Sequence, residues 1–190
     1  GIAVTTGINN TLIGGLAGIA VTTGINNTII GGLAGDALTT GSDNVALGYQ
    51  ALSSANTNES GNVAIGSNSL RLLDNGSTAY TYNTAVGHSS GGSMTTGTLN
   101  TIVGGLAGDA LTEGNNNVAF GYAALSDETL GDKNVAIGNN ALLRQNNTSD
   151  VDAYNVAVGH DAGKATTTAI NNTIIGALAG DSITTGSNNT

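Results

Sequence analysis

The chain repeats one five-residue pattern of polar and apolar positions ten times. Each copy reads Asn, then Thr or Val, then Ala, Ile or Leu, then a large hydrophobe, then Gly. A fixed period of 17 to 21 residues between copies is typical of a solenoid, in which each repeat forms one coil of the chain, here called a rung, and buries apolar surface only by stacking on its neighbours. The copies begin at Asn10, Asn27, Asn44, Asn62, Asn83, Asn100, Asn117, Asn134, Asn155 and Asn172.

Within each rung the pattern predicts β-structure. With the Asn numbered as position 0, positions 1 and 3 carry β-forming residues that point to one face of a strand. Gly at position 4 allows a bend, and Ala or Ser at position 7 indicates a second short strand. A turn rich in Thr, Gly and Asn, such as residues 39–42, closes the rung. We therefore expect an all-β parallel β-solenoid with two short strands per rung.

The two faces of the first strand lead to different expectations. Position 3 is expected to fill the core, through Ile13, Ile30, Leu47, Ile65, Val86, Val103, Phe120, Ile137, Val158 and Ile175. Position 2 points the other way and is never polar, and a strand that is apolar on both faces is buried on both. We therefore expect position 2 to form an oligomer interface with identical chains, unless these residues merely tolerate exposure. Its members are Leu12, Ile29, Ala46, Ala64, Ala85, Ile102, Ala119, Ala136, Ala157 and Ile174.

A second, longer period groups the rungs in fours. Residues 27–99 and 100–171, here called the first and second blocks, match rung for rung, and the third rung of each is the long one of 21 residues. No change in composition marks a linker, so residues 1–190 are expected to form one continuous domain. The sequence begins within a repeat and stops inside an eleventh copy at Asn189, which indicates a segment of a longer array.

Composition and charge exclude several classes of partner. The net charge is −9, with 13 acidic residues against four Lys and Arg. Four scattered cations cannot form the basic stripe that nucleic-acid binding requires. The excess of negative charge also disfavours binding to an anionic membrane surface. There is no Cys for a disulfide or thiolate site, and no apolar run is long enough to span a bilayer. We expect no nucleic-acid partner and no membrane insertion by this segment.

Few residues suggest site chemistry. His88 and His160 occupy position 5 of equivalent rungs, and copies of one His around a threefold axis could bind a metal, although a solvated His is the simpler interpretation. Tyr49 and Tyr122 share that position and favour outer-face packing over a sugar-stacking platform. Acidic residues cluster in turns without a calcium-loop signature. We expect no cofactor and no enzyme, because no nucleophile has a base beside it in the sequence.

One structural ladder and one rival function follow from the repeated polar residues. The Asn at position 0 predicts stacked side-chain amides that bond along the axis. Thr pairs such as Thr22-Thr23 and Thr39-Thr40 suggest ice binding, but such a face needs Thr on alternate residues of a strand, so turn chemistry is the favoured interpretation.

The anchors at 62–66 and 134–138, both Asn-Val-Ala-Ile-Gly, resemble the YadA-like head repeats of trimeric autotransporter adhesins. The runs at 44–52 and 117–125 resemble repeats of phage tail fibres and related bacterial surface proteins. The resemblance covers essentially the whole chain and implies a left-handed parallel β-roll packed as a homotrimer. The rungs here are longer than the usual adhesin head repeat, which places the extra residues in the outer turns.

These features together predict a structural and interaction protein. We expect a rod segment of an extracellular fibre or filament, on a cell surface or virion, that forms a homo-oligomer and can stack end to end. A host surface, glycan or matrix ligand would meet its turns, above all the long turns at 71–82 and 143–154. The alternatives are an ice- or glycan-binding module and a lyase-type β-helix enzyme.

Overall fold

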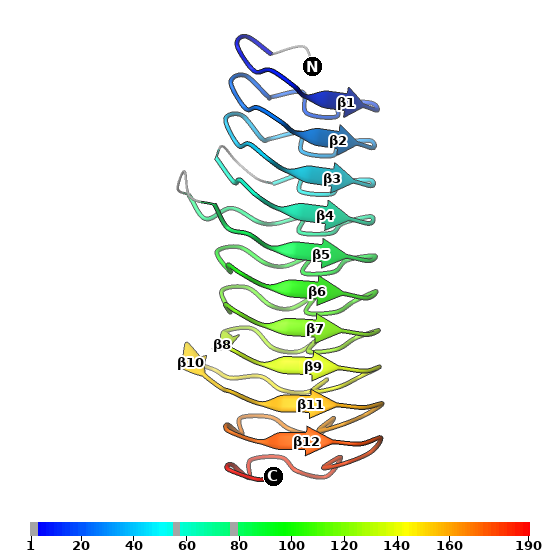
Figure 1. The fold of residues 1–190 in the computed structure, drawn as a ribbon, viewed down its shortest axis with the longest axis vertical. Helices are drawn as coiled ribbons and strands as arrows, with labels where there is room; N and C mark the ends of the chain where they lie inside the picture. The colour runs from blue at the N-terminus through cyan, green and yellow to red at the C-terminus, as the bar shows by residue number, and fades with distance from the viewer. Residues whose placement is uncertain (1–3, 55–57, 77–79) are drawn as a thin grey trace.

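The computed structural model describes residues 4–54, 58–76 and 80–190 and shows a parallel β-solenoid with no helix in those ranges (Figure 1). One strand from each rung joins a single ten-stranded sheet, and neighbouring strands pair in register, so that position 1 lies beside position 1 along the axis. The all-β solenoid predicted from the sequence is confirmed. Its strands are β1 (Thr11–Ile13), β2 (Thr28–Ile30), β3 (Val45–Leu47), β4 (Val63–Ile65), β5 (Thr84–Val86), β6 (Thr101–Val103), β7 (Val118–Phe120), β9 (Val135–Ile137), β11 (Val156–Val158) and β12 (Thr173–Ile175).

The second strand expected in each rung is replaced by turns. Backbone groups in these turns still bond the neighbouring rung, as where the Gly35 N–H donates to the Ala51 carbonyl at 2.9 Å. Two-residue strands occur only beside the long turn of the second block among the described residues, where β8 (Gly131–Asp132) pairs with β10 (Val151–Asp152). The rung therefore remains hydrogen-bonded along the axis without a second continuous sheet.

Single residues with positive φ turn the chain at fixed positions of the rung. Position 4 is always Gly; at Gly104, φ is +137°, and an added Cβ would lie 2.3 Å from the carbonyl oxygen of Gly121 in the next rung. Only Gly adopts this conformation readily, and only Gly allows the rungs to stack so closely. Positions −1, 6 and 8 are left-handed in every rung described, even where the residue is Leu, as at Leu106 with φ of +57°.

The structure reverses the assignment of faces that the sequence suggested. Position 2 points into the chain's own interior, so the predicted interface is wrong for this set: Ile29, Ala46, Ala64, Ala85, Ile102, Ala119, Ala136, Ala157 and Ile174 are buried, and Leu12 packs against them. Position 3 points outward, so the predicted core is wrong as well. Ile13, Leu47, Phe120, Ile137 and Ile175 are exposed, and Ile30, Ile65, Val86, Val103 and Val158 are half-buried. The roll is narrow, and a narrow interior accepts the Ala-rich face more readily than a continuous row of large side chains.

The core is filled by a size exchange between positions 2 and 8 of the same rung. Where position 2 is large, as at Ile102, position 8 is Gly, here Gly108. Where position 2 is Ala, as at Ala119, position 8 is commonly a buried Leu, here Leu125. In the fifth rung both are small, and Ile102 from the next rung reaches toward Gly91. Position 11 adds a further buried side chain in several rungs, as with Leu111 in the sixth rung and Met94 in the fifth.

The predicted Asn ladder is confirmed and is buried. The Asn100 Nδ2 donates to the Asn83 Oδ1 at 3.2 Å and to the Gly114 carbonyl at 2.8 Å, and the Asn100 Oδ1 accepts the Asn117 N–H at 2.9 Å. The Asn100 amide thus joins two neighbouring rungs and closes its own coil. In the second block, Gln145 bridges Asn134 and Asn155 in the ladder, at 2.8 and 3.0 Å.

Candidate functional site

The outward side of the ten-stranded sheet forms one continuous uncharged surface, apolar at position 3 and Thr or Val at position 1, here called the outer sheet face. It consists of positions 1 and 3 of every strand, where position 1 is Thr or Val and position 3 is Ile, Leu, Val or Phe. Ten rungs spaced by about 4.8 Å, each about 10 Å wide, give a projected area on the order of 500 Å². This is near the upper end of the largest apolar patches on monomeric proteins, about 300 to 600 Å², which mark interaction surfaces.

The two His residues lie far apart on the surface. His88 follows β5 and His160 follows β11, with three strands of the sheet between them. Both are exposed, and the Nδ1 of His160 lies 3.6 Å from the Asp161 Oδ2. Among the described residues, no three His, Cys, Asp or Glu side chains come together in a way that could hold a metal ion. One chain therefore does not bring the two candidates into a common site.

Tyr49 and Tyr122 are exposed and lean along the axis. A Cβ on Gly32 would lie 3.5 Å from the Tyr49 ring, and a Cβ on Gly105 would lie 3.7 Å from the Tyr122 ring. Each ring thus lies over the Gly of the preceding rung. This agrees with outer-face packing.

The Thr pairs lie in the closing turns. Thr22 Oγ1 donates to the Thr39 carbonyl at 3.2 Å, and Thr95 Oγ1 donates to the Thr112 carbonyl at 3.2 Å. These hydroxyls bond the next rung of the stack, which matches the interpretation as turn chemistry. Across the described residues, no helix has the length and hydropathy of a membrane span.

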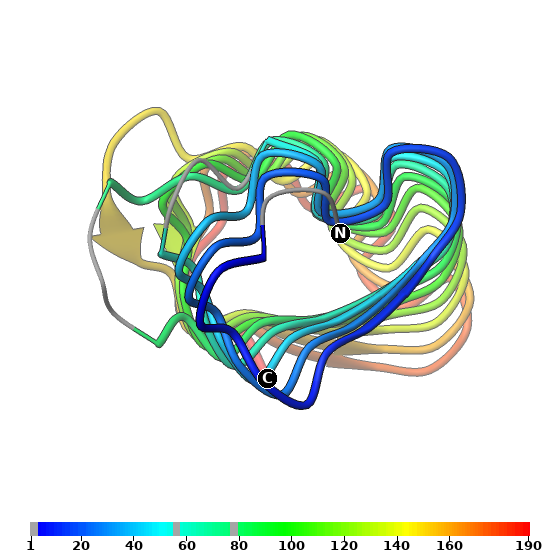
Figure 2. The same ribbon diagram turned by 90° about the horizontal axis from the view of Figure 1, so that it is seen from above.

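The long turns of the two blocks project from the side of the solenoid, as Figure 2 shows for the segment around β10. In the first block, the exposed rings of Tyr80 and Tyr82 stack with centroids 5.3 Å apart, and the Tyr80 hydroxyl donates to the Asp43 Oδ2 at 2.9 Å. This hydrogen bond contributes to lowering the pKa of Asp43, after the larger effect of the Asn26 amide. Residues 77–79 of the predicted ligand-contact turn lie outside the described residues.

The second block replaces this aromatic pair with an ion pair. Lys133 Nζ lies 2.7 Å from the Asp152 Oδ2 and 5.2 Å from the centroid of the Tyr154 ring. The hydrogen bond from Lys133 lowers the pKa of Asp152, and the same bond raises the pKa of Lys133. The two long turns therefore present different chemistry at equivalent places.

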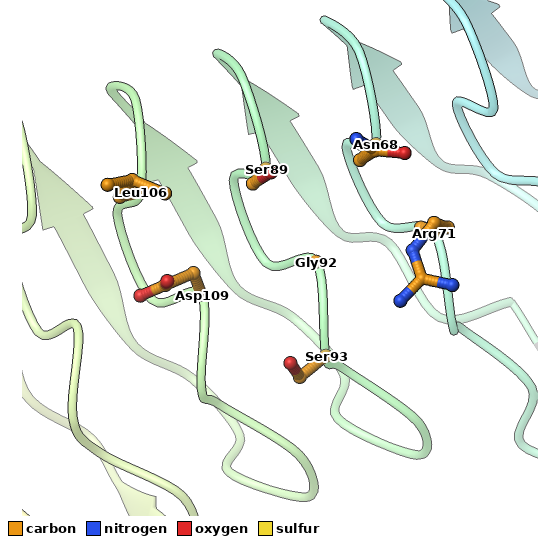
Figure 3. Close-up of a pocket in the computed structure, with 7 residues that line it drawn as sticks. All are labelled: Asn68, Arg71, Ser89, Gly92, Ser93, Leu106 and Asp109. Atoms are coloured by element: carbon orange, nitrogen blue, oxygen red, sulfur yellow. The ribbon is translucent and has the colours of Figure 1, made fainter.

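A pocket of about 270 Å³ opens on the turns that follow β4, β5 and β6, with the strands behind them (Figure 3). Its charged members are Arg71 and Asp109, its polar members are serines and an amide, and Leu106 supplies an apolar wall. The complete lining is Asn68, Arg71, Ser89, Gly92, Ser93, Leu106 and Asp109. The pocket is not apparent in the sequence, because its members come from three successive rungs and only stacking brings them together.

No protein-family model matches the chain, and no curated protein or solved structure matches it either.

Proposed function

We propose that the chain is a rod segment of an extracellular fibre or filament, in which three copies pack through their outer sheet faces. The observation that supports this proposal is the outer sheet face itself, which is apolar at position 3 in all ten rungs and carries no charge at positions 1 or 3. The predicted partner surface therefore moves from position 2 to positions 1 and 3. The number three comes from the resemblance to trimeric adhesin heads.

The hydrogen bonding suits a rod that withstands tension along its axis. Strand pairing, turn bonds and the Asn ladder all run along the axis, so that pulling on the ends loads many bonds together. Stacked repeats stabilise one another through their interfaces, which makes a long array stable where a single rung is not. Ten rungs give a shaft on the order of 50 Å long at about 4.8 Å per rung. The turns on its sides would present a repetitive surface for attachment.

The assembly can be tested by sedimentation equilibrium on the purified chain. We expect a mass of three times the 18.5 kDa of one chain. Phe120→Lys places a charge on the outer sheet face at a side chain that is 55% exposed in the single chain, so it should lower the mass to that of one chain and leave the far-ultraviolet circular dichroism unchanged.

A matched control is Leu178→Lys, because Leu178 is similarly exposed, at 57%, but lies in a turn outside the outer sheet face. This variant should keep the mass of the parent chain. A parent chain that is monomeric at micromolar concentration, or a Phe120→Lys variant that retains the assembled mass, would contradict the proposal.

A further inference from the structure

We propose that the pocket lined by Arg71 and Asp109 binds a single sugar unit that carries a carboxylate. In this assignment the guanidinium of Arg71 pairs with the ligand carboxylate, and Asp109 with Ser89 and Ser93 bonds the ring hydroxyls. The inference goes beyond the fibre proposal and does not depend on the assembly state, because the pocket lies on the turns outside the outer sheet face (Figure 3).

Among the described residues, Arg71 is a cation without a partner. It is half-buried, and within the described part of the chain its guanidinium forms no ion pair or side-chain hydrogen bond. A planar guanidinium matches a carboxylate with two parallel hydrogen bonds, which are stronger than those between neutral groups. In a chain with only four Lys and Arg against 13 acids, a free Arg beside a cavity favours an anionic ligand.

Asp109 provides the acceptor on the other side of the pocket. Its Oδ1 accepts the Ser126 hydroxyl at 2.5 Å from the next rung, which orients the carboxylate. Its Oδ2 accepts no hydrogen bond from the residues that the structure describes. A carboxylate held in this way can accept hydrogen bonds from neighbouring sugar hydroxyls. The Ser89 and Ser93 hydroxyls can accept such hydrogen bonds as well. It also disfavours a second negative charge, which restricts the ligand to one carboxylate.

The size and the apolar wall fit one sugar ring. The volume of about 270 Å³ holds on the order of nine waters at about 30 Å³ each. Sites for drug-sized ligands begin at about 300 Å³, so a single ring is the appropriate scale. Leu106 offers an apolar surface to the C–H face of such a ring.

The equivalent place in the second block contains an internal ion pair. Asn140, Asp161 and Lys164 occupy the positions of Asn68, Ser89 and Gly92. Asp161 accepts the Asn140 amide at 2.8 Å and the Lys164 ammonium at 3.3 Å, so its charge is neutralised within the protein. The position of Arg71 is taken by Leu143. At this place the first block thus holds a cation without an acidic partner among the described residues, and the second block holds a Lys–Asp pair.

Isothermal titration with methyl β-glucuronide tests the assignment. We expect one site per chain with a dissociation constant on the order of 1 mM, the scale for about a dozen ligand atoms at modest efficiency. Methyl β-glucoside, which lacks the carboxylate, and propionate, which lacks the ring, should each bind at least tenfold more weakly. Equal binding of the glucoside would overturn the role of the carboxylate, and equal binding of propionate would overturn the sugar class.

Protein variants separate the pocket from other surfaces. Arg71→Met should weaken glucuronide binding at least tenfold. Ser89→Asp with Gly92→Lys introduces the Asp–Lys pair of the second block and should abolish binding with the unfolding midpoint retained. Binding that survives either change, or that is lost only together with the fold, would overturn the proposal.

A constructive variant completes the test. Four substitutions copy the remaining lining into the second block, where Leu178 and Asp181 already match Leu106 and Asp109. They are Leu143→Arg, Asp161→Ser, Lys164→Gly and Ala165→Ser. We expect two sites per chain in the titration, and a stoichiometry that stays at one would count against the assignment.

Discussion

The size exchange between positions 2 and 8 can be tested by giving one rung the residue pair of another. Ile102→Ala with Gly108→Leu would give the sixth rung the pair found at Ala119 and Leu125 in the seventh. The backbone is compatible, because φ is +50° at Gly108 and +56° at Leu125. The double variant should therefore refill the core that the first change empties.

The magnitudes follow from the packing. Ile102 is fully buried, so Ile102→Ala removes three carbons at about 0.8 kcal/mol each and leaves a cavity, for a loss of about 3 to 4 kcal/mol. Gly108→Leu alone overpacks the rung, because a Cβ at Gly108 would already lie 3.2 Å from the Ile102 Cδ1. Overpacking costs about 1 to 3 kcal/mol. We expect the double variant to lie within about 1.5 kcal/mol of the parent, which is a favourable coupling of about 3 kcal/mol.

Urea unfolding followed by circular dichroism at one protein concentration measures all four states of the cycle. The reverse exchange in the seventh rung, Ala119→Ile with Leu125→Gly, is the matched control and should show coupling of the same sign. Losses that simply add in the double variant, with coupling below about 0.5 kcal/mol, would refute the idea that the two positions share one volume.

Three further predictions concern the backbone, the ladder and the titration of one carboxyl. Gly104→Ala should destabilise the chain by more than about 3 kcal/mol in urea unfolding, because Cβ would meet the next rung; Gly15→Ala, with open space around it, should change the midpoint little. Asn100→Ala should cost about 2 to 4 kcal/mol, since it strands the Gly114 carbonyl and the Asn117 N–H; a loss no larger than that of exposed Asn139→Ala would contradict the ladder. Burial raises the pKa of Asp36, whose Oδ1 has no hydrogen-bond partner among the described residues, so the folded state disfavours its charge. With Asp36 protonated, the parent does not bear the cost of burying its charge, and it loses that advantage in folding free energy as pH rises through the folded pKa. Asp36→Asn should therefore raise the unfolding midpoint at pH 7 but not below the unfolded pKa of 3.8. An equal gain at both pH values would argue against the burial effect.

The sequence could predict some of the candidate surfaces but not others. The long turns are visible as extra residues in two rungs, and the structure shows their exposed Tyr80 and Tyr154. The pocket was not accessible, because Arg71, Gly92 and Asp109 share position 9 of three rungs and look unrelated until the rungs are stacked. An alignment of the two blocks could have pointed to this place, since Gly92 in the first block aligns with Lys164 in the second.

The sequence by itself determined the coil. The period places one rung every 17 to 21 residues, Gly at position 4 marks a corner that only Gly can form, and Asn at position 0 predicts the buried ladder. These features depend on local conformation and on the stacking of identical positions, which a repeat makes visible in one dimension.

Only the tertiary structure decided which face of the strand lies inside. Alternation separates positions 1 and 3 from position 2, but both faces are apolar, and apolarity alone does not distinguish a core from an exposed sheet. The choice depends on the width of the roll, which is set by the turns across the interior and by what position 8 contributes there. With Leu125 reaching in from the turn, the interior has room for Ala119 and none for Phe120. The large residues therefore point outward.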